Sequence, residues 1–140
     1  MKYRPLPIQG AYILELEKHE DNRGFLARSW DKKEFADHGV DCEMRQGYVC
    51  HTAKKGTIRG LHYMTVAETK ITRVTAGKLF EVIDDLRPNS PTYKKWFGNE
   101  FTAADYRMLL VPAGCAHAIL TLEDHTEYIA YYSIYYDPLK

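Results

Sequence analysis

Hydrophobic and polar residues alternate along most of the chain, and this alternation predicts strands. The alternating runs cover residues 11–17, 24–30, 43–52, 57–64, 69–76, 78–86, 95–101, 108–111, 115–122 and 126–136. Successive side chains of a strand point to opposite faces of a sheet, so such runs are typical of strands with one buried face. The turn-forming residues 20–24 are expected to join the first two strands.

One short segment departs from this pattern and predicts a helix. Asp31 is a typical N-cap with Glu34 three positions on, Phe35 follows, and Gly39 is a stop signal. The remaining strands are short and separated by turn residues, which is typical of an all-β sandwich or barrel. Because no linker interrupts the pattern, residues 1–140 are predicted to form a single domain with one short helix.

Composition and charge exclude several classes of function. The 140 residues contain 19 Lys and Arg against 19 Asp and Glu, and a balanced charge argues against a nucleic-acid partner. No apolar run is long enough to span a membrane, and the first residues lack the apolar region of a secretory signal. Cys42, Cys50 and Cys115 are spaced for neither a disulfide framework nor a metal-binding pair. We therefore expect a cytoplasmic protein with reduced, buried thiols.

The densest group of chemically capable residues is Arg59-Gly60-Leu61-His62-Tyr63. Glycine weakens a strand and often marks a bulge or the close approach of another backbone. Either feature would turn Arg59 and His62 to the same face in spite of their odd spacing. The alternative interpretation is structural, with His62 in the core and Arg59 on the surface.

His117 and Lys70 extend this group of candidates. His117 follows a tight turn and stands between small residues, and Lys70 begins an alternating strand. With His62 and Arg59 inside a barrel, they would suit an anionic ligand bearing a carbonyl group, because arginine binds phosphate, lysine stabilises an enolate and histidine transfers a proton. Taken alone, Lys70 is more typical of a solvated strand end. No metal is expected, because Met64 stands where metal-binding barrels carry a second histidine.

Several motifs, taken in order, point to one family. They are Asp21-Asn22-Arg23-Gly24-Phe25, Gln46, Lys54-Lys55-Gly56-Thr57-Ile58-Arg59-Gly60-Leu61-His62-Tyr63, Lys70-Ile71-Thr72-Arg73-Val74, Asp85-Leu86-Arg87, Ser90-Pro91-Thr92-Tyr93, Pro112-Ala113-Gly114-Cys115-Ala116-His117 and Tyr135-Tyr136-Asp137-Pro138. In order and spacing they resemble the dTDP-4-dehydrorhamnose 3,5-epimerase family, which are cupin-type β-barrels acting on nucleotide-linked 4-keto-6-deoxy sugars. The resemblance implies a single-domain cupin or jelly-roll barrel that binds a nucleotide-diphosphate sugar.

The resemblance also implies roles for individual residues. His62 matches the general base that removes the proton at C3, and also at C5 in bifunctional members, while Lys70 matches the lysine that stabilises the O4 enolate. Four positions match substrate-binding residues, namely Arg23 and Arg59 for the diphosphate, Gln46 for the nucleotide and His117 for the sugar. No cofactor is implied. Such barrels form homodimers by exchanging strands, and Trp30 and Trp96 are candidate aromatic residues of the surface.

The position of the family's general acid differs in this chain. The family has a tyrosine where this chain has Ala130, and an asparagine where this chain has Tyr48. Tyr128 and Tyr132 share a strand face with Ala130. Tyr132 is therefore a candidate displaced acid and Tyr128 a candidate substrate contact, and the alternative is that both only pack the barrel.

The family's base has an aspartate partner in a segment that would lie beyond Lys140, which leaves Asp84 or Asp85 as candidate partners of His62. The sequence predicts a cofactor-independent isomerase, a C3 epimerase of a nucleotide-linked 4-keto-6-deoxyhexose in deoxysugar and surface polysaccharide (O-antigen) biosynthesis. Two alternatives stay open. One is a 3,4-ketoisomerase in which His62 both removes and returns the proton, and the other is a nucleotide-sugar-binding protein without turnover.

Overall fold

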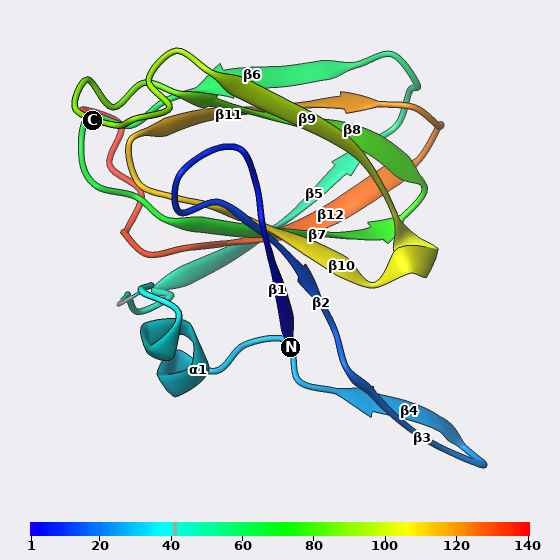
Figure 1. Cartoon of the computed structure of the whole chain (residues 1–140). Coiled ribbons are helices and arrows are strands. Elements are labelled where there is room, and N and C mark those ends of the chain that lie inside the picture. The colour runs from blue at the N-terminus through cyan, green and yellow to red at the C-terminus, as the bar shows by residue number, and fades with distance from the viewer. Residues whose placement is uncertain (41) are drawn as a thin grey trace.

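The computed structural model describes residues 1–40 and 42–140, and strands dominate it (Figure 1). The strands are β1 (Lys2–Pro5), β2 (Tyr12–Glu15), β3 (Lys18–Asp21), β4 (Gly24–Ala27), β5 (Gln46–Thr52), β6 (Ile58–His62), β7 (Lys70–Ala76), β8 (Lys78–Asp85), β9 (Trp96–Thr102), β10 (Arg107–Val111), β11 (Cys115–Thr121) and β12 (Thr126–Tyr132). In these residues the helical segments are α1 (Lys32–Asp37) and the 3-10 turn η1 (Ala103–Asp105), neither long enough to cross a membrane. The predicted all-β class is confirmed.

Two antiparallel sheets face each other and form the body of the molecule (Figure 1). One sheet has the strand order β1-β2-β10-β7-β12-β5, and the other has the order β6-β11-β8-β9. The consecutive strands β5 and β6 are thus the outermost strands of opposite sheets. We call this side of the molecule the β5–β6 edge. Along it, the residues of β6 are exposed, as is Tyr48 of β5, whereas Thr52 at the end of β5 is buried.

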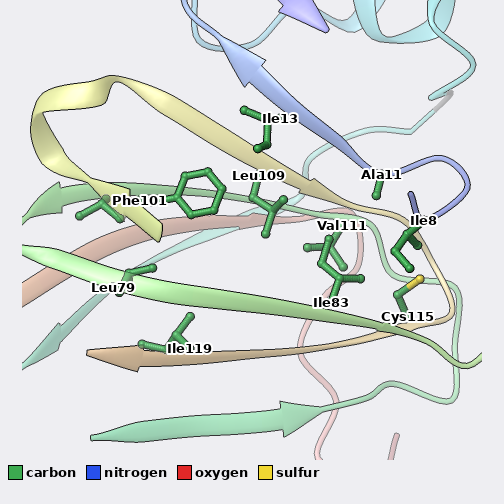
Figure 2. Packing of buried hydrophobic residues seen from close by; sticks show 11 residues of the cluster. Ile8, Ala11, Ile13, Leu79, Ile83, Phe101, Leu109, Val111, Cys115 and Ile119 are labelled. Atoms are coloured by element: carbon green, nitrogen blue, oxygen red, sulfur yellow. The ribbon is translucent and has the colours of Figure 1, made fainter. Parts of the chain in front are cut away.

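Apolar side chains fill the space between the sheets away from this edge (Figure 2). The cluster consists of Ile8, Ala11, Ile13, Val74, Leu79, Ile83, Phe101, Leu109, Val111, Cys115 and Ile119. A second cluster lies on the outer face of the six-stranded sheet, where Ile71, Met108 and Leu110 pack with Leu14 and with Phe35 of α1. Full burial of a side chain such as Phe35 stabilises the fold by about 1.5–3 kcal/mol. The polar inner residues of the two sheets lie beside the first of these apolar clusters.

The helix forms as its capping residues predict. The Asp31 carboxylate accepts a hydrogen bond from the Glu34 backbone N–H at 3.0 Å, and α1 ends before Gly39, which has a positive φ of 83°. This cap satisfies one of the free N–H groups of the first helical turn, an interaction typically worth about 1 kcal/mol.

The prediction for the first part of the chain misses the strand β3. Within the run 11–17 only Tyr12–Glu15 forms a strand, β2, while β3 follows at Lys18–Asp21, outside the predicted runs, and pairs with β4. β2 instead lies between β1 and β10 in the larger sheet. The alternation marks the residues as extended, but it cannot show where an extended run bends from one sheet into another. β1 was not predicted, because a four-residue segment ending in Pro5 gives too short a pattern.

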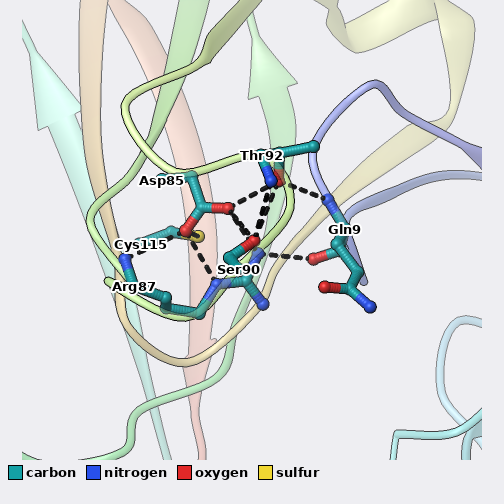
Figure 3. Close-up of polar contacts among 6 residues, drawn as sticks. All are labelled: Gln9, Asp85, Arg87, Ser90, Thr92 and Cys115. Atoms are coloured by element: carbon teal, nitrogen blue, oxygen red, sulfur yellow. Dashed lines mark hydrogen bonds and ion pairs between the residues drawn. The ribbon is translucent and has the colours of Figure 1, made fainter.

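A buried carboxylate organises the loop between β8 and β9 (Figure 3). Asp85, fully buried at the end of β8, accepts hydrogen bonds from Arg87 Nε at 2.8 Å and Nη2 at 2.9 Å. The hydroxyls of Ser90 and Thr92 both donate to Oδ2, the oxygen that also accepts from Nη2, each at 2.6 Å. Arg87 Nη2 also donates to the backbone oxygen of Gln9, so the network joins this loop to the N-terminal segment.

Candidate active site

Polar side chains from both sheets point inward toward the β5–β6 edge. They come from alternate positions of the strands, as a two-residue period requires. The larger sheet contributes Gln46, Tyr48, Cys50, Thr52, Lys70, Thr72, Tyr128 and Tyr132, and the smaller sheet contributes Arg59, His62, Glu81 and His117. Most of the residues that the sequence singled out are thus on one inner surface, and the two sheets form its opposite walls.

A bulge in β6 places Arg59 and His62 on the same face. His62 is paired with His117, and Arg59 with Ile119, so two residues of β6 oppose Ala118. Gly60, one of the two, has a φ of +117°, and a side-chain carbon there would lie 2.7 Å from the His117 carbonyl oxygen. Only glycine fits this combination of backbone angle and close approach. The bulge predicted from Gly60 is confirmed. Both side chains are exposed, because β6 is the edge strand of its sheet.

His117 belongs to a buried hydrogen-bonded chain that connects the two walls. Its Nε2 lies 3.1 Å from Oε1 of Glu81, and the Thr72 hydroxyl donates to the same oxygen at 2.7 Å. Glu81 is 2% exposed and Thr72 also 2%. Buried polar groups of this kind are retained only with their partners in place, so the chain fixes the orientation of the imidazole. The pattern of the sequence did not indicate a site role for Glu81 or Thr72.

Lys70 is buried, so its interpretation as a solvated strand end is wrong. The residue is 5% exposed, and its ammonium forms an ion pair with Glu68 at 3.0 Å. The same ammonium lies 5.5 Å from the centre of the Tyr132 ring. A buried lysine with a single carboxylate partner holds its positive charge at a fixed point on the wall opposite His62. Such a charge is what an anionic oxygen would need.

The electrostatic surroundings keep His62 in the form that accepts protons. Partial removal from water lowers the pKa of His62 below its usual value of 6.5, and the positive charges of Lys70, His117 and Arg59 lower it further. Lys70 and His117 are therefore near enough to act on His62 across the inner space. At neutral pH the ring is uncharged and has a free lone pair, as a general base requires.

This lowered pKa predicts the acid limb of the pH profile. Any reaction that uses neutral His62 as its base should run at a constant rate near pH 7 to 8 and fall as the pH drops through the lowered pKa. We expect the midpoint below pH 6.5, followed by a loss of about tenfold per pH unit as the imidazole becomes protonated. The rate of proton exchange measured from pH 4.5 to 8 checks this, and a midpoint above 6.5 contradicts it.

Three tyrosines and one alanine line the larger sheet near Lys70. Tyr132 is paired with Lys70 across β12 and β7, while Ala130 is paired with Tyr48 across β12 and β5. The rings of Tyr48 and Tyr132 meet edge to face, 5.4 Å apart at an interplanar angle of 83°. Tyr128 lies deeper and packs against the apolar cluster. Tyr48 was noted in the sequence only as a departure from the family.

Two predicted substrate-binding residues lie at the β5–β6 edge. Arg59 joins the edges of the two sheets, because its Nε donates to the Thr52 hydroxyl at 2.9 Å and its Nη2 to the His51 carbonyl at 3.3 Å. Gln46 donates from Nε2 to the Tyr48 hydroxyl at 2.8 Å and accepts at Oε1 from the Tyr136 backbone N–H. Arg59 therefore presents a positive charge beside the entrance to the inner surface.

Arg23 is not brought to the other candidates within one chain. It lies at the turn of the β3–β4 hairpin, which projects from the body on the side away from β6 (Figure 1). Its side chain is 84% exposed and pairs with Asp21 at 2.5 Å. The fold of one chain therefore does not place Arg23 at the inner surface, where the predicted contact with a diphosphate would be made.

The aspartates expected to support His62 are placed elsewhere. Both oxygens of Asp85 are bound by Arg87, Ser90 and Thr92 in the loop network described above. Asp84 is the neighbouring residue of β8 and points to the outer face. In residues 1–40 and 42–140, no group of three acidic, histidine or cysteine side chains is arranged to hold a metal ion.

In the described part of the chain no disulfide joins Cys42, Cys50 and Cys115, and all three carry reduced sulfur. Cys115 is buried, as expected, but Cys42 and Cys50 are only partly buried. Burial raises the pKa of the Cys115 thiol to about 12, so it is unreactive at neutral pH.

Comparison with known proteins agrees with this architecture. The family model described as dTDP-4-dehydrorhamnose 3,5-epimerase matches residues 5–140. An enzyme of that name from Pseudomonas aeruginosa is 34% identical over 131 residues, covering 92% of this chain and 72% of the relative.

Solved structures extend the likeness to three dimensions. The Bacillus anthracis dTDP-4-dehydrorhamnose 3,5-epimerase, with TDP and PPi bound, is 39% identical with a TM-score of 0.91, covering 98% of this chain and 79% of that one. A 3′-monoepimerase from Streptomyces bikiniensis, in complex with dTDP-quinovose, is 28% identical with a TM-score of 0.86, covering 96% and 69%. The cupin-type fold is confirmed, and the chain belongs to the dTDP-4-dehydrorhamnose 3,5-epimerase family.

Proposed function

We propose that this chain is a cytoplasmic, cofactor-independent C3 epimerase of a nucleotide-linked 4-keto-6-deoxyhexose in deoxysugar biosynthesis. The observation that carries the proposal is the opposition of two groups across one inner space. Neutral His62 lies on one wall, and the buried ammonium of Lys70 lies on the other. A base and a fixed positive charge facing each other are what the removal of a proton beside a ketone requires.

The first half of the reaction follows from this placement. The C4 ketone acidifies the hydrogen on C3, and His62 removes it as a proton. The electron pair of the broken C3–H bond forms a C3–C4 double bond, and the charge moves to O4. Lys70 stabilises that oxyanion, and His117, held by Glu81, lines the sugar site. Return of a proton to the other face of C3 inverts the carbon and restores the C4 ketone.

The relatives support the substrate class. One solved relative holds TDP and PPi, and another is a 3′-monoepimerase holding dTDP-quinovose. All three ligands contain a diphosphate, and dTDP-quinovose is also a nucleotide-linked sugar. Arg59 at the β5–β6 edge supplies the positive charge that a diphosphate needs, and its planar guanidinium suits phosphate oxygens.

Incubation with dTDP- and CDP-linked 4-keto-6-deoxyglucose in heavy water tests the proposal. We expect deuterium to enter at C3, followed by NMR, together with formation of the C3 epimer. Movement of the carbonyl to C3 without an epimer would instead identify the 3,4-ketoisomerase. Binding of the nucleotide sugar without any exchange would identify the protein as a binding module and reject the enzymatic proposal.

A homodimer forms part of the same proposal. The β3–β4 hairpin extends away from its own barrel, and all four residues of β3 are exposed. Arg23 at its turn would reach a diphosphate only in a second copy of the chain. Light scattering should give a mass of twice 16.2 kDa for the purified protein. A single-chain mass at all protein concentrations would reject this part of the proposal.

A further inference from the structure

We propose that Tyr48 is the acid that returns the proton to C3 from the wall opposite His62. This inference rests on the proposed epimerisation, which requires a proton donor on the larger sheet because the base lies on the smaller one. The phenols on the inner face of that sheet are Tyr48, Tyr128 and Tyr132. The contacts of each decide among them.

Tyr48 occupies the space left by a small side chain. It is the direct cross-strand partner of Ala130 and points to the same side of the sheet. Opposed side chains of an antiparallel pair begin only about 5 Å apart, so a phenol at either position serves nearly the same volume. The alanine methyl leaves room for the Tyr48 ring, which rests edge-on against Tyr132. Tyr48 is 44% exposed, so its ring borders the open side of the inner surface, where a ligand would enter.

A hydrogen bond from Gln46 orients the hydroxyl of Tyr48. Gln46 accepts from the Tyr136 backbone N–H through Oε1, which turns its NH₂ group toward Tyr48. That NH₂ donates to the phenol oxygen at 2.8 Å. The oxygen is therefore an acceptor in this bond and its own O–H remains available. The same amide donor would stabilise the phenolate that remains after proton transfer.

The other two phenols are less suited to this step. Tyr128 packs against the apolar cluster, and burial together with a hydrogen bond to Cys50 raises its pKa well above the usual value. Burial, followed by the nearby charge of Glu68, raises the pKa of Tyr132 to about 12. Its ring also lies beneath the Lys70 ammonium. Tyr132 thus helps to place the positive charge, and Tyr48 is left as the donor.

The proposed step balances in protons and electrons. The C3–C4 π electrons of the enolate form a new C3–H bond with the Tyr48 proton, while the O4 electron pair re-forms the ketone. Tyr48 is left as a phenolate and His62 as an imidazolium. The imidazolium loses its proton to solvent and the phenolate gains one, which restores the enzyme.

The Tyr48→Phe variant separates this inference from the proposed function. It keeps the ring and its contact with Tyr132 but removes the acidic proton. His62 would still remove the C3 proton and return a deuteron to the same face, so deuterium exchange at C3 should stay within about threefold of wild type. Epimer formation should fall about 100-fold, the typical contribution of a general acid. The matched control is Tyr131→Phe, which removes a phenol from the outer face of β12 and should change neither rate.

Two outcomes would overturn the inference. The first is a Tyr48→Phe variant that forms the epimer within about threefold of the wild-type rate, in which case another group is the donor. The second comes from exchanging the opposed residues. The double variant Tyr48→Ala/Ala130→Tyr keeps the summed side-chain volume. It should form the epimer at least about tenfold faster than Tyr48→Ala alone. A double variant no more active than Tyr48→Ala would show that a phenol at position 130 cannot donate the proton in place of one at position 48. Absence of C3 exchange in the wild type would instead reject the proposed function.

Discussion

The His62→Asn variant is expected to lose deuterium exchange at C3 by about 1000-fold, within the range that a positioned general base contributes. Asparagine is similar in size and polar, but it does not accept a proton at neutral pH. The lowered pKa of His62 means that the neutral, active form predominates in the wild-type protein near pH 7. Exchange should therefore disappear without any change in the midpoint of thermal unfolding, since His62 is exposed.

The control for this variant is another exposed histidine. His51 lies on β5 and its side chain points to the outer face, so His51→Asn removes an imidazole but leaves the inner surface intact. Its backbone carbonyl, which accepts from Arg59, is unchanged. Exchange in His51→Asn should equal that of wild type. Retention of more than a tenth of the exchange rate in His62→Asn would show that a different group removes the proton.

The Asp85→Ala substitution should strongly lower the free energy of unfolding. Burial alone would raise the pKa of Asp85, but hydrogen bonds from Arg87, Ser90 and Thr92 outweigh it and hold the pKa well below its usual range. Truncation leaves Arg87 without its carboxylate and two hydroxyls without their acceptor. Because the Arg87 side chain is 27% exposed, we expect the lower end of the cost of breaking a buried pair, about 3 kcal/mol. The midpoint of thermal unfolding should fall by about 10 °C.

The adjacent residue provides the control for this prediction. Asp84→Ala removes a carboxylate from the outer face of the same strand and should shift the midpoint by little more than 1 °C. Acidic pH should destabilise the protein in the same way as the Asp85→Ala substitution, because it protonates the Asp85 carboxylate. The depressed pKa means that the stabilisation is complete above the unfolded-state pKa of about 4 and is lost as the pH falls below it. An Asp85→Ala protein as stable as Asp84→Ala at pH 7 would contradict the assigned role of the network.

The alternation of the sequence predicted the strands of the two sheets except β1, because most of them have one face in the core and one outside. The inward placement of Arg59 and His62 was also predictable, since Gly60 signals a bulge. Lys70 was ambiguous for a physical reason. A lysine at a strand start is normally solvated, and only the fold brings Glu68 beside it. Its burial could not be read from residue type.

Other parts of the site depend on which strands become neighbours. Glu81 lies at an inward position of the run 78–86, and a carboxylate at such a position is the signal that could have revealed it. Its partners His117 and Thr72 come from two other strands, so the connection follows only from the strand order. Likewise, the facing of Tyr48 and Ala130 requires that β5 pairs with β12, a contact between segments about eighty residues apart in the chain.

The extra residue in β6 makes two sequence spacings equivalent. Because Gly60 and Leu61 together oppose Ala118, the separation of Arg59 from His62 by two residues gives the same facing as a separation by one residue in a regular strand. A regular strand with one residue between the arginine and the histidine would face the same pair inward. The extra residue of β6 therefore bends and twists the strand without changing which two side chains point to the inner surface.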